Sequence, residues 1–109
     1  MMTPEKVKKF VAQFHSTEEL SRGCKGALIG ALEKAAGGSE GRHLVLGYLF
    51  GDGKPLSSKE LTPSQWVGLR EWIGMQSVGD VWIPRKEFAD EVKSVLSAKS
   101  EKRIYVFDD

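Results

Sequence analysis

Apolar residues recur at helical spacing near the start of the chain. They lie three or four residues apart, whereas lysines fill much of the remaining face of the segment. The apolar positions are Val7, Phe10, Val11 and Phe14. Thr3 can cap the free N–H groups of a helix, and Pro4 suits the first helical position. The pattern predicts an amphipathic helix that begins at Pro4 and ends near His15.

A second helical pattern runs up to the Gly37–Gly38 pair. Ser16 and Glu19 have the S-x-x-E spacing of a capping box, so we expect the helix to begin there. Three glycines interrupt its apolar face, and each costs about 1 kcal/mol relative to alanine inside a helix. They are Gly23, Gly26 and Gly30. Either another helix packs closely against them, or the helix breaks near Gly23, or a ligand approaches the backbone there.

The middle of the chain predicts two helices separated by a loop. Residues 41–50 place apolar side chains on one helical face, and Gly51–Asp52–Gly53 ends the pattern. In the loop that follows, Ser57 and Glu60 have capping-box spacing around a single short turn. The segment Thr62–Pro63–Ser64–Gln65 combines a cap, a proline at the first helical position and a glutamine at the capping-box position. The helix that begins there is expected to end at Gly74 and to bury a stripe formed by Trp66, Leu69, Trp72 and Ile73.

The last third of the chain predicts one helix between two extended segments. Residues 81–83 are apolar and precede Pro84, which disfavours a helix at the residue before it. A helix is expected from Pro84 to Ala98. The β-branched and aromatic run Ile104–Phe107 predicts a short strand. Such a strand needs a partner, either residues 81–83 of the same chain or a strand of another molecule.

These elements together predict a mainly α fold, a small bundle of four or five helices with a minor C-terminal β element. The 109 residues suit one compact domain, so residues 1–109 are expected to form a single helical domain. Hydrophobic residues make up 40% of the chain, which is enough to build a core.

Charge and cysteine content narrow the classes of function. Sixteen basic and fifteen acidic residues give a net charge of +1. This near-neutral charge argues against a protein that coats nucleic acid nonspecifically. The single cysteine, Cys24, allows no intramolecular disulfide and fits a reducing compartment. The first residues lack the apolar run of a signal peptide, and no segment has the length of a membrane span. We therefore expect a cytoplasmic protein with no membrane partner.

The sequence contains no recognisable catalytic or metal-binding motif. His15, His43 and Cys24 lack the spacing of a zinc site, and Cys24 lies on an apolar helical stripe where cysteine acts as a small hydrophobe. The segment Gly51–Lys54 lacks the spacing of a P-loop, and Asp108–Asp109 fits a solvated tail better than a metal site. No cofactor, metal or enzymatic activity is therefore expected.

Binding is the remaining chemistry. Ser57, Ser58 and Lys59 precede the capped helix, and Arg70 lies further along it. A helix N-terminus presents free N–H groups and partial positive charge, which can hold a phosphate or an acidic partner surface. The basic residues of the last helix form no clear patch, since acidic neighbours offset them. The basic set is Arg85, Lys86 and Lys93, and the acidic set is Glu87, Asp90 and Glu91.

Residues 42–74, which read RHLVLGYLFGDGKPLSSKELTPSQWVGLREWIG, resemble a helical module of phage proteins. The module occurs in GemA-like regulators of transposable phages and near the C-termini of some phage single-strand annealing proteins. The matching positions are Leu46, Leu49, Phe50, Gly51, Ser57, Ser58, Lys59, Glu60, Leu61, Thr62, Leu69, Trp72 and Ile73. The segment Asp52–Leu56 and Trp66 depart from the pattern. The resemblance implies an association with DNA transactions and carries over no catalytic residue.

Two functions follow as hypotheses. The preferred one is a non-enzymatic binding module that acts on DNA or on a DNA-processing protein, and the resemblance implies that a phage or mobile element encodes it. The alternative is a protein-interaction module, such as an adaptor, an inhibitor or a self-associating subunit, that makes no contact with nucleic acid. Its candidate surface is any exposed tryptophan together with the strand Ile104–Phe107, which would form a homodimer by strand addition.

Overall fold

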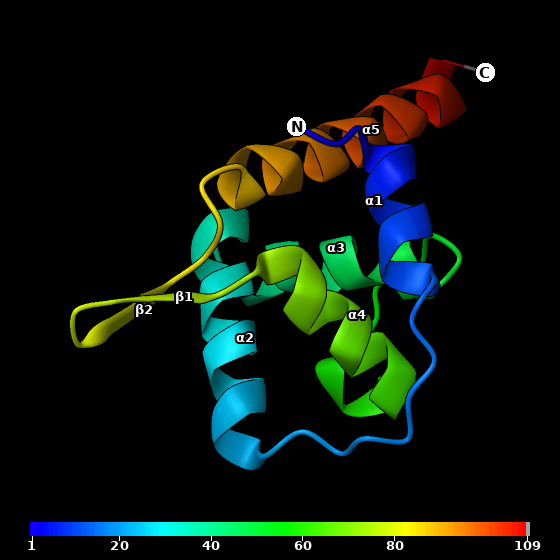
Figure 1. The fold of residues 1–109 in the computed structure, drawn as a ribbon. Helices are drawn as coiled ribbons and strands as arrows, with labels where there is room; N and C mark the ends of the chain where they lie inside the picture. The colour runs from blue at the N-terminus through cyan, green and yellow to red at the C-terminus, as the bar shows by residue number, and fades with distance from the viewer. Residues whose placement is uncertain (109) are drawn as a thin grey trace.

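The computed structural model describes the backbone of residues 1–108 and the side chains of residues 1–98. The described part of the chain is mainly helical, which confirms the predicted fold class (Figure 1). The helices are α1 (Pro4–Ala12), α2 (Arg22–Ala36), α3 (Ser39–Phe50), the 3-10 turn η1 (Ser58–Glu60), α4 (Pro63–Ile73) and α5 (Phe88–Asp108). The strands β1 (Gln76–Val78) and β2 (Val81–Ile83) form an antiparallel hairpin between α4 and α5. No helix among the described residues is long and apolar enough to cross a membrane.

The first helix begins as predicted and ends earlier. Thr3 caps α1, since its Oγ1 accepts a hydrogen bond from the backbone N–H of Lys6 at 3.3 Å. The helix stops at Ala12, before the predicted end near His15. Val7 and Val11 are fully buried and form the apolar face that the spacing predicts.

The predicted start of the second helix is wrong. Ser16 does not cap a helix; its Oγ accepts from the N–H of Glu18 at 2.9 Å, and its own N–H donates to Ser64 Oγ at 2.9 Å. That second bond ties the connection to the start of α4. The cap of α2 is Ser21, whose Oγ accepts from the N–H of Cys24 at 3.1 Å.

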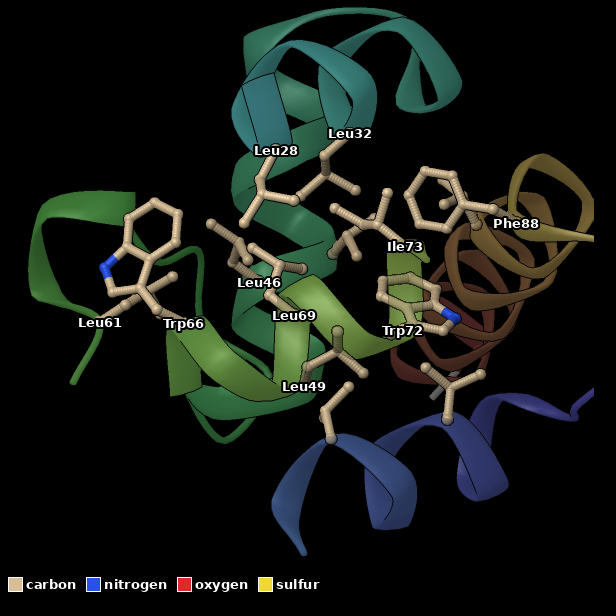
Figure 2. Close-up of a cluster of buried hydrophobic side chains, with 14 of the residues drawn as sticks. Leu28, Leu32, Leu46, Leu49, Leu61, Trp66, Leu69, Trp72, Ile73 and Phe88 are labelled. Atoms are coloured by element: carbon tan, nitrogen blue, oxygen red, sulfur yellow. The ribbon is translucent and has the colours of Figure 1, made fainter. Parts of the chain in front are cut away.

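The middle of the chain folds as the sequence predicts. Residues 39–50 form a helix, and both capping boxes, at Ser57 and at Thr62, are present. Helix α4 lies among the other helices and contributes the largest buried side chains to the core (Figure 2). Trp72 is fully buried, and its ring meets Phe88 of α5 edge-on at a centroid distance of 4.8 Å. Residues from α1, α2, α3, α4 and α5 share this single hydrophobic cluster.

The predicted C-terminal strand is wrong. Residues 104–107 belong to α5, which runs without a break from Phe88 to Asp108. No glycine or proline interrupts residues 88–109, so the helix continues through the β-branched run. Residues 81–83 are extended as predicted, but they pair with Gln76–Val78 and not with Ile104–Phe107. The homodimer proposed through a strand at Ile104–Phe107 therefore loses its structural basis.

Candidate binding surface

The residues predicted to bind phosphate are already engaged in local structure. Ser57 Oγ accepts from the N–H of Lys59 at 3.3 Å, and the N–H of Ser57 donates to Glu60 Oε2 at 3.4 Å. Ser58 is buried, with 9% of its surface exposed. The N-terminus of α4 is occupied in the same way, because Thr62 and Gln65 each cap the other's N–H. An anion at either helix start would have to replace these caps.

Arg70 lies away from Ser57, Ser58 and Lys59. It is in the second half of α4, where its Nη1 binds Glu18 Oε2 at 3.1 Å and its Nε binds Glu71 Oε2 at 3.2 Å. Partial burial lowers the pKa of Arg70, but the hydrogen bonds and charges of these two carboxylates raise it above its ordinary value. The structure thus brings together the three loop residues and places Arg70 in a separate ion-pair network.

The residues considered for a zinc site are also dispersed. Cys24 is half-buried and packs against the hydrophobic core. His43 Nε2 lies 3.0 Å from Arg42 Nη2, and Arg42 Nη1 also binds Glu33 Oε1. Among the described residues, no group of three or more His, Cys, Asp or Glu side chains is placed to hold a metal ion.

The exposed apolar surface of the molecule is concentrated on the hairpin. Val78, Val81, Trp82 and Ile83 expose between 43% and 63% of their surface, with Trp82 at 63%. Among the described side chains, Met1 is the other large hydrophobic residue that is strongly exposed. Figure 1 shows the hairpin projecting from the helical body, and its strands pack mainly against each other. Contiguous exposed apolar groups of this kind mark interaction sites.

Sequence reasoning missed half of this hairpin. Gly79 has φ +64° and Asp80 completes a two-residue turn, which sets Val78 opposite Val81. Glycine followed by Asp between two short extended runs is a known hairpin signal, and it could have been read from residues 76–83.

A groove separates the hairpin from α2. It consists of two hollows of about 560 and 780 Å³ that share Ala27, Met75 and Trp82 in their walls. Along α2 the groove extends from Gly23 to Ala35, roughly 18 Å at the helical rise per residue. Residues of α2, many of them small, line one side of the groove, and Trp82, the end of α4 with Arg70 and Glu71, and the start of α5 line the rest.

The base of the hairpin is held by a buried carboxylate. Glu91 of α5 is 1% exposed and accepts hydrogen bonds from Trp72 Nε1 at 2.9 Å, from the backbone N–H of Met2 at 2.8 Å and from Arg85. Arg85 also donates through Nε to the carbonyl of Trp72 and through its backbone N–H to the carbonyl of Ile73, both at 2.9 Å. These contacts tie the chain leaving β2 to the end of α4, where the hairpin begins.

We expect the burial and hydrogen bonding of Glu91 to make the stability of the fold sensitive to acid. Burial alone would raise the pKa of Glu91, but the hydrogen bonds from Met2, Arg85 and Trp72 and the charge of Arg85 lower it below its ordinary value of 4.5. A carboxylate with a lowered pKa in the folded state stabilises the fold above about pH 4.5, and this contribution is lost as the pH falls through the lowered value. Urea unfolding at pH 7 and pH 3 should show a larger loss of stability for the wild type than for Glu91→Gln. Equal losses in both proteins would contradict this assignment.

Comparison with known proteins adds no relative. No protein-family model, curated protein or solved structure matches this chain. The resemblance of residues 42–74 to phage helical modules therefore stays a prediction.

Proposed function

We propose that this chain is a non-enzymatic protein-interaction module whose contact surface is the hairpin and the groove beside it. The observation that supports this proposal is the exposure of Trp82, a large side chain that is 63% exposed on a hairpin of exposed apolar residues. Tryptophan is enriched among the residues that dominate binding energy at interfaces. A cytoplasmic location, expected from the single cysteine, belongs to the same proposal.

The hairpin itself supports this function. A two-stranded hairpin is marginally stable in water unless another element packs against it. Here β1 and β2 are exposed along their whole length, yet the base is fixed by Arg85 and Glu91. A fixed arm loses less conformational freedom on binding than a mobile one, which favours affinity.

The DNA-binding hypothesis receives less support at the residues first selected for it. Of the four residues, Ser57 caps a turn, Ser58 is buried and Arg70 is in an ion pair. Lys59 is exposed, and its side chain makes no hydrogen bond or ion pair with the described residues. Steep weakening of DNA binding with salt, lost on Lys59→Ala, would restore that hypothesis.

Site-specific crosslinking tests the proposed function directly. A photoreactive benzoylphenylalanine replaces Trp82 in one variant and Lys59 in another, and each is irradiated in a lysate of the cells that express the chain. We expect position 82 to form adducts with protein and position 59 to form none. Adducts to nucleic acid at either position, or no adduct at position 82, would refute the protein-interaction function.

A simpler prediction accompanies this experiment. Trp82→Ala should change the melting temperature by less than about 3 °C, because surface substitutions seldom alter stability by more than about 0.5 kcal/mol. The same variant, added in excess, should fail to compete for the adducts formed at position 82. Competition equal to that of the wild type would show that the indole ring contributes nothing to binding.

A further inference from the structure

The three glycines of α2 have no explanation within the described fold. A Cβ atom built on Gly23, Gly26 or Gly30 would meet no atom of another described element within 4 Å, so no other helix in the described part of the chain packs closely there. All three lie inside α2, and none is among the residues with positive φ. Each therefore lowers helix stability relative to alanine without a compensating contact in the described chain.

Two of these glycines line the groove beside the hairpin. Gly23 and Gly30 lie in its wall with Ala27 between them, whereas Gly26 lies outside it. Positions 23, 27, 30 and 34 follow the i, i+4, i+7, i+11 spacing of one helical face. Helices approach one another most closely where the contact residues are small. The groove wall is thus shaped for a helix that lies along α2 for about three turns.

The charges at one end of the groove are of a single sign. Lys34, Arg85, Lys86 and Lys93 line the larger hollow, and no Asp or Glu is among the described residues that line it. Arg85 is paired with Glu87 and Glu91, but Lys34, Lys86 and Lys93 have no ion pair among the described side chains. Glu91, which the sequence suggested would offset Lys86 and Lys93, is buried and paired with Arg85. An occupant with carboxylates at this end would be complementary.

We propose that the groove between α2 and the hairpin binds an acidic amphipathic helix of a partner protein. This inference rests on the proposed protein-interaction function and names its partner class. The small apolar face of the helix lies on Gly23, Ala27 and Gly30, and Trp82 covers its other side. Its carboxylates pair with Lys34, Lys86 and Lys93. A second copy of this chain fits less well, because it would bring an equally basic groove edge to the interface.

The test uses a synthetic 18-residue helical peptide with alternating Ala and Leu on its apolar face and Glu on its flanks. It is titrated into the ¹⁵N-labelled chain, where glycine amides and the indole N–H of Trp82 give well-separated signals. We expect shifts at Gly23, Gly30 and Trp82, and at least tenfold weaker binding by the same peptide with Lys in place of Glu. Equal binding of both peptides, or no shift at the groove, would overturn the proposal.

Matched variants separate the groove from the rest of α2. Gly30→Leu should abolish binding, whereas Gly26→Leu should preserve it, since the two changes alter helix propensity alike. Gly26→Ala and Gly30→Ala should each raise the melting temperature by roughly 3–6 °C, and the thermal unfolding of the two leucine variants, measured in the same way, shows that they fold. Loss of binding in both leucine variants, or in neither, would contradict a helix seated on Gly30.

A third titration distinguishes a protein partner from a nucleic acid in the groove. A fifteen-nucleotide oligothymidylate is titrated under the same conditions, since exposed aromatic and basic side chains also bind single-stranded nucleic acid. Tighter binding of the oligonucleotide than of the acidic peptide at the same signals would overturn the proposal. Protein adducts at position 82 without peptide binding would refute only the acidic helix and leave the interaction function standing.

Discussion

Glu91→Ala is expected to lower the free energy of unfolding by about 3–5 kcal/mol, the usual cost of removing one partner from a buried ion pair. The change leaves the indole N–H of Trp72 and the N–H of Met2 without their acceptor. It also frees Arg85, so the base of the hairpin loses its attachment to α5. Urea unfolding monitored by tryptophan fluorescence measures the effect, because Trp72 reports on the same site.

Two further variants define the cause of that loss. Glu91→Gln keeps the shape and one acceptor oxygen, so a smaller loss of about 2 kcal/mol is expected. Glu87→Ala removes an exposed carboxylate that also pairs with Arg85, at 3.4 Å, and should cost under about 1 kcal/mol. If Glu87→Ala proved as destabilising as Glu91→Ala, the buried network would not be the anchor of the hairpin.

The helices could be predicted from the sequence because their signals are local. Thr62 and Gln65 are three residues apart, and the box they form in the structure depends on nothing distant in the chain. The same holds for the capped start of α1 at Thr3. Ser16 carried an identical local signal and gave a wrong helix start. Its N–H is bound by Ser64, 48 residues away, and this tertiary contact holds residues 16–18 outside a helix.

The role of Glu91 could not be predicted for the same reason. On the sequence it is one of several acidic residues on an amphipathic helix, and nothing marks it as buried. Its burial depends on Trp72, Met2 and Arg85, which come from three other parts of the chain. Lys86 and Lys93 line the larger hollow, whereas none of the three neighbouring carboxylates does, so a basic groove edge appears where the sequence suggested neutrality.

The candidate site was predicted only in part. The sequence named any exposed tryptophan as the surface of a protein-interaction module, but whether an extended segment is covered depends on distant parts of the chain, so the exposure of Trp82 could not be predicted. Trp66 and Trp72 fall on the helical stripe of α4 and are buried, whereas Trp82 lies in a two-stranded arm with no sheet to cover it. Of the three explanations that the sequence left open for the glycines of α2, a close helix is absent from the described fold and a break near Gly23 does not occur, since α2 is continuous from Arg22 to Ala36.

Gly68→Ala is expected to destabilise the chain by about 2 kcal/mol or more, although alanine favours a helix. A Cβ atom at position 68 would overlap the carbonyl oxygen of Val11 and lie 3.1 Å from its carbonyl carbon. Both are backbone atoms, so α1 as a whole must move away from α4. Forcing extra volume into a packed interior costs about 1–3 kcal/mol, occasionally more, and here it exceeds the gain in helix propensity of about 1 kcal/mol.

Gly26→Ala provides the matched control, because it makes the same substitution inside a helix where the added Cβ meets no atom. It should stabilise the chain by about 0.5–1 kcal/mol, which is the propensity gain without a clash. Opposite signs for the two substitutions would show that one glycine serves the fold and that the other is not needed for it. If Gly68→Ala also stabilised the chain, the close approach of α1 and α4 would be wrong. If Gly26→Ala destabilised the chain, a contact within the chain would account for that glycine, and Gly23 and Gly30 would no longer indicate a bound partner helix.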